Sequence, residues 1–489
     1  MQNVDFIKMS KSSFLSQAKL VGRNVWHFVE LQSTLIFCLL LFLLDLSYPI
    51  IISYDSGHYL WLTSLIKERQ WSLWDPIRNI GFPLGIHLSR VMFGDNANAV
   101  HYLFSFLHCI LLIVGVNIVN FAVNSKRKTV ISKFVISIII FVLVAVDPTI
   151  FGYYNTLLTE FVSVTLAVLA IWLCILILRE DTRSSNFKTI LYICCLAILV
   201  VLSWHLKQPY IGAALFPFTL LAAILFVNKP TRKKSGIVLI GVIASLIFVF
   251  ISTQLWTRFL VENGNPMPAE RQLTNVIKTT PRNHLRCISA SGTEKENILN
   301  QYLAFSNFYY LDQSRCDIIT EPNLFISAEN GAIAQRIFNN KGISNILGVG
   351  PYTSYVQMFN QPGNYPSDRI NDIFTDRIPI SNFLFTSSML VLPLFLVIAL
   401  LVYLIKKIEL AAILTIMLGT SFGNLLGHIV MGILPLDRYL LLSYVLNLLS
   451  LVIGVIAAGN WIGFRIQLFA DKRLATKTVS LGKKLKENL

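Results

Sequence analysis

Long apolar runs constrain this chain more than any other feature. Ten stretches of mainly apolar residues alternate with polar segments, and the 489-residue sequence is 54% hydrophobic but only 14% charged. About 20 residues of helix cross a bilayer, and no soluble domain needs so much apolar surface. We therefore predict a polytopic α-helical membrane protein with about ten transmembrane helices. The predicted spans are residues 33–53, 99–122, 134–151, 156–179, 189–203, 210–227, 235–253, 383–404, 410–431 and 440–463.

The distribution of charge assigns the two faces of these spans. The net charge is +15, but Lys and Arg gather in the N-terminal segment, the C-terminal tail and alternate loops, where acids are few. This asymmetry is typical of cytoplasmic loops and is not the footprint of a nucleic-acid-binding protein. It predicts a multi-pass protein of the plasma (inner) membrane with both termini inside.

The spans divide the chain into five parts. A polar stretch of roughly 130 residues between the seventh and eighth spans is long enough for a small mixed domain, which the topology makes extracytoplasmic. The expected parts are a cytoplasmic N-terminal segment (1–32), a transmembrane module (33–253) with a first outer loop (54–97), an extracytoplasmic domain (254–381), C-terminal helices (382–463) and a basic cytoplasmic tail (464–489). The first outer loop has helical spacing of apolar residues followed by Trp71 and Trp74, which favours a helix along the outer surface with tryptophans at headgroup level.

Two of the seven cysteines lie in the polar segment. Cys287 and Cys316 are expected to form a disulfide there, since the outer compartment is oxidising. Closing that loop contributes about 3–4 kcal/mol on the chain-entropy model. The other five cysteines lie in apolar runs and are expected to be buried thiols.

Polar residues from distant parts of the chain fall on the predicted outer face. Ionisable groups near membrane depth are costly and are functional candidates by default. The candidates are Asp55, His58 and Tyr59 after the first span, Glu160 in the first turn of the fourth, His205 and Lys207 between the fifth and sixth, and Arg438 with Tyr439 before the tenth.

Two kinds of chemistry suit these residues. A carboxylate such as Asp55 could deprotonate an acceptor hydroxyl while Lys207 or Arg438 binds a phosphate. Asp55 with Glu160 could instead hold a divalent cation. Each residue also has a structural role open to it: a helix cap for Asp55, dipole complementation for Glu160 and interfacial anchoring for the two cations. Asp45, inside the first span, is a buried polar partner for another helix or part of the site.

Motifs with a specific mechanism are absent from the sequence. It contains no HExxH, no pair of CxxC motifs, no Walker sequence and no glycine-rich nucleotide loop on the cytoplasmic side. A cytoplasmic enzyme that uses a sugar nucleotide is therefore disfavoured, and the cofactor stays unknown.

The outer-face residues resemble, in order and spacing, the GT-C superfamily of integral-membrane glycosyltransferases. The first element is the acidic hexapeptide from Tyr54 to Tyr59 after the first span. The others are Trp74-Asp75-Pro76, Gly81-Phe82-Pro83 and Phe93-Gly94 in the first outer loop, Leu158-Thr159-Glu160, Lys207 with Pro209, and Arg438-Tyr439. Ser56 stands where many members carry a second acid, which favours a metal-independent version, while Glu160 and Asp147 leave a divalent cation open.

This resemblance implies a reaction. The donor is a polyprenyl-phosphate-linked sugar held at the outer surface of the membrane lipid, and the acceptor is an extracytoplasmic glycan, lipid or protein. Asp55 is the general base and Lys207, with Arg438, stabilises the leaving phosphate; Glu160 is the second catalytic candidate. His58, Tyr59, His205 and Tyr439 are the remaining substrate-binding candidates.

Two other classes of protein remain open. A lipid-linked polysaccharide polymerase or ligase of another fold would rely on arginines of the large outer segment, such as Arg271, Arg282, Arg286 and Arg315. A lipid or solute transporter would carry charges within its spans and an internal repeat. The sequence shows few such charges and no clear repeat.

Overall fold

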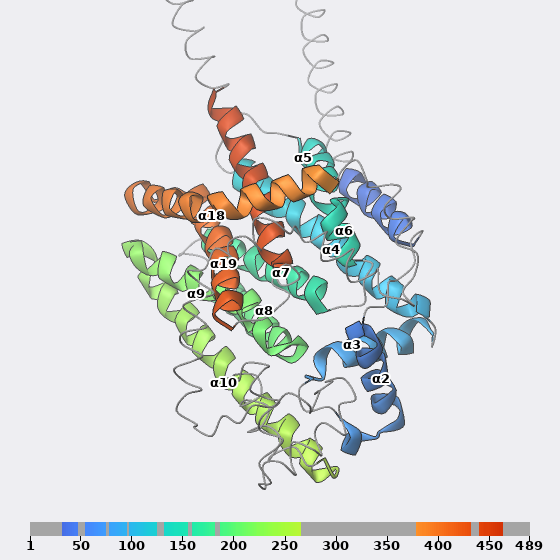
Figure 1. Cartoon of the computed structure of the whole chain (residues 1–489). Coiled ribbons are helices and arrows are strands. Elements are labelled where there is room, and N and C mark those ends of the chain that lie inside the picture. The colour runs from blue at the N-terminus through green and yellow to red at the C-terminus, as the bar shows by residue number, and fades with distance from the viewer. Residues whose placement is uncertain are drawn as a thin grey trace, which may run out of the picture.

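The regular structure of the described part of the chain is helical. The computed structural model in Figure 1 describes residues 32–46, 54–74, 78–94, 97–124, 132–154, 159–180, 186–265, 378–431 and 440–462. The helices are Gln32–Leu46, α2 (Tyr54–Glu68), α3 (Gly81–Phe93), α4 (Ala97–Asn124), α5 (Lys133–Ile140), α6 (Pro148–Tyr154), α7 (Thr159–Arg179), α8 (Asn186–Leu206), α9 (Ile211–Val227), α10 (Arg232–Glu262), α18 (Ile378–Lys406), α19 (Glu409–Met431) and Leu441–Ile462.

A helix stands at each of the ten predicted spans, but their lengths differ. Five helices are long and apolar enough to cross a membrane: Ala99–Asn124, Thr159–Arg179, Phe187–Leu206, Lys229–Glu262 and Leu441–Ile462. At the other five positions the apolar helical stretches are shorter: Gln32–Leu46, Lys133–Ala145, Ile211–Val227, and the parts Val391–Lys406 of α18 and Glu409–Leu425 of α19. The chain is thus an α-helical protein with several helices capable of spanning a bilayer, and the count of ten spans stays a prediction.

Helix α7 lies at the centre of the bundle. It is apolar around its whole circumference and buried along most of its length, as expected for a helix enclosed by others. It packs against α4, α8 and α9. Both of its ends therefore come to lie beside the turns of neighbouring helices, and these two ends hold the polar sites described below.

Helix α10 combines close packing on one face with apolar exposure on the other. A Cβ atom on Gly241 would lie 2.4 Å from Cγ2 of Ile193, so the glycine lets α10 approach α8. On its outer face Ile240 is 67% and Phe250 64% exposed. Exposed apolar side chains along a helix of this length are what contact with lipid requires.

The third predicted span is interrupted. After α5 the chain forms a π-helical turn, Phe141–Ala145, and a new helix begins at Pro148. Proline suits the first position of a helix because it has no N–H to leave unpaired. Asp147 caps this helix, since its Oδ1 accepts a hydrogen bond from the Ile150 N–H at 3.2 Å.

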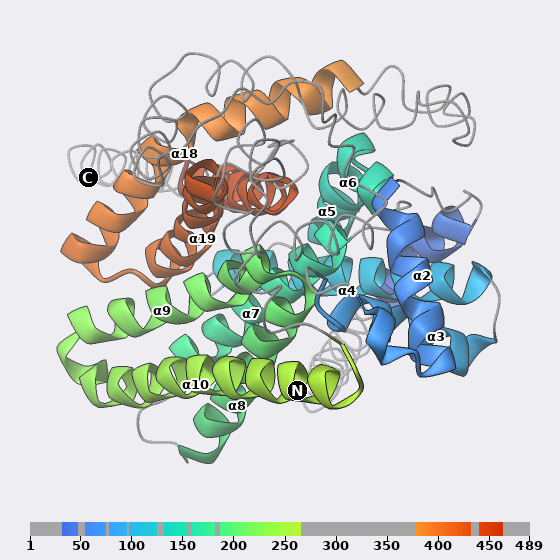
Figure 2. The same ribbon diagram turned by 60° about the horizontal axis from the view of Figure 1, so that its bottom comes forward.

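The first outer loop forms a compact helical unit, α2 and α3, beside the end of α10 (Figures 1 and 2). Trp74 is fully buried with Leu62, Leu65 and Leu260 in a small separate core. The Asn265 side chain donates hydrogen bonds to the Trp71 and Trp74 carbonyls, both at 3.0 Å. The Trp74 indole is therefore enclosed by α2 and α10, and its depth in the membrane stays a prediction.

Helix α10 also runs further than expected. It continues to Glu262 rather than ending near residue 253, and α18 begins at Ile378. The last turns of α10 carry Arg258 and Glu262 among apolar residues, so the helix continues beyond the apolar run on which the predicted span rests. The rest of the expected extracytoplasmic domain (residues 266–377), with Cys287 and Cys316, lies outside the described residues.

Candidate functional site

A buried acid and a partly exposed base meet at the predicted outer end of the bundle. Glu160 lies in the first turn of α7, and its Oε1 is 4.0 Å from Nζ of Lys207. The Glu160 side chain is 2% exposed and that of Lys207 is 19% exposed. At this distance the charges attract each other without sharing a hydrogen bond. The two residues that the sequence assigned to separate turns therefore belong to one site.

The local backbone explains the position of Lys207. Helix α8 ends at Leu206, and Lys207 is extended with φ −166° and ψ 129°. A short 3-10 turn containing Pro209 follows, and the Tyr210 N–H donates to the Lys207 carbonyl at 2.8 Å. The proline cannot continue the helical hydrogen-bond ladder, so the lysine stands at a break between two apolar helices.

Tyr210 and Glu160 both lie beside the Lys207 amine. Its Nζ lies 5.8 Å from the centroid of the Tyr210 ring, within the range of a cation–π contact. The carboxylate of Glu160 lies in the first turn of α7, near the positive end of the helix dipole. The Lys207 amine is thus positioned by two elements, α7 and the turn before α9, and its charge is offset by that of Glu160.

The connection between α2 and α3 reaches the same break. The Asn79 side chain donates a hydrogen bond to the Trp204 carbonyl in the last turn of α8. A Cβ atom on Gly81 would lie 2.6 Å from the His205 carbonyl oxygen. Only glycine allows this approach of the first outer loop to the residues before Lys207. The loop that carries Asp55 is thereby attached to the Glu160–Lys207 site.

Asp55 and His58 lie in the first two turns of α2. The predicted loop is thus helical from its beginning, and only the backbone of these two residues is described. Their distances from Glu160 and Lys207 stay untested, and Asp55 as base stays a prediction.

Tyr59 is enclosed rather than open to a substrate. It is 1% exposed, and its ring meets that of Phe82 edge-on at 4.7 Å. Its hydroxyl accepts a hydrogen bond from Nη1 of Arg78 at 3.1 Å. The tyrosine therefore orients Arg78, a half-buried cation next to Asn79 that the sequence reading missed. The sequence feature that could have identified Arg78 is its place as a basic residue in the Pro- and Gly-rich segment before α3.

His205 bonds across to α10. Its Nε2 lies 2.9 Å from Oγ of Ser252, while the neighbouring Trp204 indole donates to Oγ1 of Thr253 at 2.8 Å. These contacts fix the end of α8 just before Lys207.

A second acid–base pair is fully buried. Nδ1 of His108 in α4 lies 3.1 Å from Oδ2 of Asp45, and both side chains are 0% exposed. The imidazole stacks on the Tyr154 ring at 3.7 Å, and the Tyr154 hydroxyl accepts the His108 backbone N–H. Asp45 is therefore a buried polar partner for another helix, one of the two roles open to it from the sequence. Its partner was missed because one histidine in an apolar run gives no signal.

The remaining candidates are described only in part. Arg438, Tyr439, Cys287 and Cys316 lie outside the described residues.

The five cysteines of the apolar runs are free thiols, of which Cys38 and Cys174 are buried but Cys194 is exposed. Burial of all five was thus a wrong expectation, because α8 turns one face outward. Among the described side chains, no three of His, Cys, Asp and Glu gather to hold a metal ion.

The comparisons with known proteins give one distant structural likeness. The chain is similar to the crystal structure of ArnT from Cupriavidus metallidurans bound to undecaprenyl phosphate, with a TM-score of 0.32 and 11% sequence identity over 86% of this chain and 76% of that chain. No protein-family model and no curated protein matches the chain. A likeness this distant carries no function with it, so the chemistry of the chain's own residues has to carry the functional conclusion.

Proposed function

We propose that this protein is a membrane glycosyltransferase that moves a sugar from a polyprenyl-phosphate carrier to an extracytoplasmic acceptor. The observation that carries the proposal is the Glu160–Lys207 pair, held at a break between two apolar helices on the predicted outer side of the bundle. A lipid-linked phosphate needs that combination: a fixed cation at the end of apolar helices that can accommodate a long tail.

Lys207 stabilises the leaving group. As the bond between the anomeric carbon and the phosphate oxygen breaks, the electron pair stays on the polyprenyl phosphate and its negative charge grows. An amine already held in place stabilises that charge without reorganisation. Arg438 assists from the turn before Leu441–Ile462. Glu160 is too enclosed, at 2% exposure, to reach a substrate freely, and so it positions the amine of Lys207.

Asp55 activates the acceptor. Its carboxylate takes the proton from the acceptor hydroxyl as that oxygen forms the new bond to the anomeric carbon. A single base opposite the leaving phosphate suits inversion at that carbon. His58, His205 and Tyr439 line the approach of the two substrates. Tyr59 contributes indirectly, because its hydroxyl holds the side chain of Arg78 in place.

The test is transfer by the purified full-length protein, measured as release of polyprenyl phosphate from a panel of polyprenyl-phosphate hexoses and pentoses. Asp55→Asn should lower kcat by about 100- to 10,000-fold. Lys207→Ala should lower it by about 100- to 1,000-fold. The matched control is Arg258→Ala, which removes one positive charge from the same face at a side chain that is 79% exposed. Unchanged turnover in both site variants would exclude the proposed roles.

The buried Asp45–His108 pair favours one alternative, a proton-coupled transporter. Ionisable pairs within membrane helices are the usual parts of proton relays. Asp45→Asn distinguishes the two functions: a transporter would lose proton coupling in proteoliposomes, whereas a transferase would keep its donor turnover per folded molecule.

A further inference from the structure

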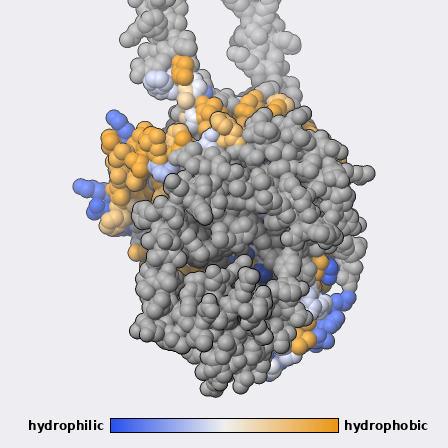
Figure 3. Space-filling model, viewed as in Figure 1, coloured by the Kyte–Doolittle hydropathy of each residue, from blue (hydrophilic) through white to orange (hydrophobic). Residues whose placement is uncertain are grey.

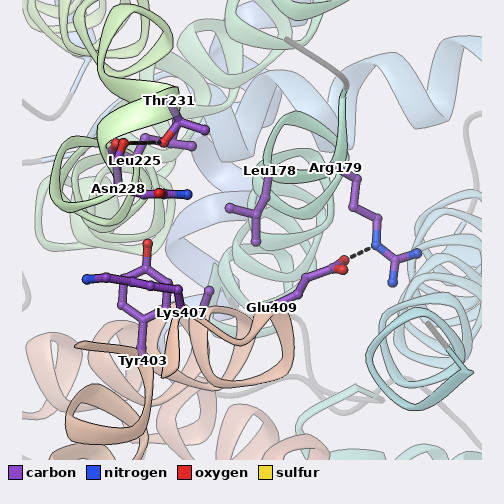
Figure 4. A pocket seen from close by; sticks show the side chains of 9 residues that line it. Leu178, Arg179, Leu225, Asn228, Thr231, Tyr403, Lys407 and Glu409 are labelled. Carbon is purple, nitrogen blue, oxygen red and sulfur yellow. Dashed lines mark hydrogen bonds and ion pairs between the residues drawn. The ribbon is translucent and has the colours of Figure 1, made fainter. Parts of the chain in front are cut away.

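A second polar site lies at the other end of α7. Where α7, α9 and α18 end and α19 begins, the described residues line an open cavity of about 490 Å³. Its lining is Leu178, Arg179, Leu225, Asn228, Thr231, Tyr403, Lys407, Glu409 and Ala412 (Figure 4). Glu160 and Arg179 are separated by 19 residues of helix, or roughly 30 Å, about the thickness of the hydrocarbon core. The cavity therefore faces the side of the membrane opposite the Glu160–Lys207 site.

Lys407 has an unusual backbone conformation at this cavity. Its φ is +51°, in the left-handed region, and its N–H donates to the Tyr403 carbonyl at 2.8 Å. This is the position after a helix end where glycine is usual, because a Cβ atom is strained there. Strained residues of this kind gather at ligand sites, where the side chain supplies what glycine cannot.

The amine of Lys407 is held over a fixed ring. Its Nζ lies 5.1 Å from the centroid of the Tyr403 ring. The Tyr403 hydroxyl in turn donates a hydrogen bond to the Ile224 carbonyl at 2.7 Å, which locks the ring against α9. The cation is thus positioned at the cavity wall before any ligand arrives.

The acid at the cavity is neutralised. Glu409, the single acid of the lining, forms an ion pair with Arg179. Arg179 also donates to the Phe121 carbonyl at 2.8 Å and lies over the Phe121 ring. In Figure 4 this pair lies to one side, and Lys407, Tyr403 and Asn228 lie to the other. The cavity therefore carries one positive charge, at Lys407, with the Asn228 amide as a further polar group.

The surroundings combine exposed apolar and basic side chains. Ile405 is 71% and Phe226 61% exposed near the helix ends, and Lys229, Arg232 and Lys406 are exposed beside them. In Figure 3 hydrophobic atoms cover the region where Figure 1 places the end of α18, with hydrophilic atoms at their outer border. Such a border is where the headgroups of a bilayer lie, and the basic pockets between helices on this side suit anionic lipids.

We propose that this cavity binds a phosphate-bearing anion, with Lys407 as the charged ligand and Asn228 as a hydrogen-bond donor. The phosphate comes from the headgroup of an anionic phospholipid or from free phosphate. The site is separate from the transfer reaction and does not depend on it.

The experiment measures binding by the full-length protein in phosphatidylcholine nanodiscs. Dioleoylphosphatidylglycerol is added at increasing mole fraction, and inorganic phosphate is added in a parallel series; bound ligand is followed by native mass spectrometry and by the thermal midpoint. Lys407→Gly removes the amine while relieving the backbone strain, so loss of binding does not reflect misfolding. Lys406→Ala removes the neighbouring charge from a residue outside the cavity and is the matched control.

Lys407→Gly should weaken phosphatidylglycerol binding by about tenfold, the effect of losing one charge-assisted hydrogen bond, and Lys406→Ala by less than twofold. The same dependence on Lys407 with inorganic phosphate alone would support the site and identify free phosphate as its ligand. Equal binding by Lys407→Gly and the wild type would overturn the proposal. Equal losses in the two variants would also overturn it, because they would reflect general surface attraction. A lower thermal midpoint for Lys407→Gly with unchanged binding would assign the lysine to the dipole of α18 instead.

Discussion

At the scale of single residues, the Glu160–Lys207 pair permits a test of positioning. Glu160→Gln keeps the shape of the side chain but removes the charge that faces Nζ of Lys207 at 4.0 Å. We expect kcat for sugar transfer to fall by roughly 100-fold, since displacement of a catalytic group by about 1 Å has that effect. The KM for the donor should change much less. Turnover per folded molecule and donor KM, measured together, check this expectation. A rise in KM alone would mean that Glu160 acts only on donor binding.

Tyr59 offers a matching prediction for stability. Tyr59→Phe keeps the edge-on contact with Phe82 and removes the hydroxyl that accepts from Arg78. The free energy of unfolding should fall by about 1 kcal/mol, the usual net value of one buried hydrogen bond. Thermal unfolding in detergent gives this change, and Tyr102→Phe, at a less buried ring, serves as control. An unchanged midpoint would show that Arg78 is held by its other contacts.

The sequence predicted single residues best where a break in hydropathy marked them. Lys207 stood out because a lysine and a proline interrupt 39 apolar-rich residues, and Glu160 because it opens an apolar helix; the structure brings these two together. The Asp45–His108 pair could not be predicted, because pairing depends on which helices pack and at what height. For the same reason Tyr59 resembled an exposed aromatic ligand, although α3 covers it.

At the scale of elements, hydropathy located the helices but not their ends or contacts. All ten predicted spans coincide with helices, while α10 runs to Glu262 and the third span divides at Asp147–Pro148. Helix ends depend on capping residues and on packing against neighbouring helices. The average hydropathy of a stretch of sequence contains information on neither. The α2–α3 unit is the clearest case, since its attachment to α8 depends on the close approach at Gly81 and on the Asn79 hydrogen bond to the Trp204 carbonyl.

Gly81→Ala tests that attachment. The new Cβ atom would lie 2.6 Å from the His205 carbonyl oxygen, so α3 must move away from the end of α8. We expect a loss of about 1–3 kcal/mol, as for other overpacked contacts, together with a lower rate of sugar transfer. Gly85→Ala, on the same helix, has no atom within 4 Å of its new Cβ. It should be neutral or more stable by up to about 1 kcal/mol, because alanine favours helix. Equal effects of the two substitutions would contradict the close approach.

At the scale of the whole molecule, two polar sites lie at opposite ends of one buried helix. The α7 helix carries Glu160 in its first turn and Arg179 in its last. The basic residues of the turn between α9 and α10 lie with the Arg179 end, as the charge bias requires for the cytoplasmic face. The transferase proposal needs this orientation, because a polyprenyl-phosphate donor and an extracytoplasmic acceptor must both reach Lys207.

Thiol labelling in intact cells decides the orientation. Single cysteines at Arg258 in the last turns of α10 and at Lys229 in the turn before it are placed in a background without the seven native cysteines. A membrane-impermeant maleimide should modify Arg258→Cys in intact cells, and Lys229→Cys only after the membrane is opened. Both side chains are exposed, so access from each side decides the result rather than burial. Labelling of Lys229→Cys from outside would place Lys207 in the cytoplasm, where a sugar nucleotide or an inward-facing carrier would have to replace the proposed donor.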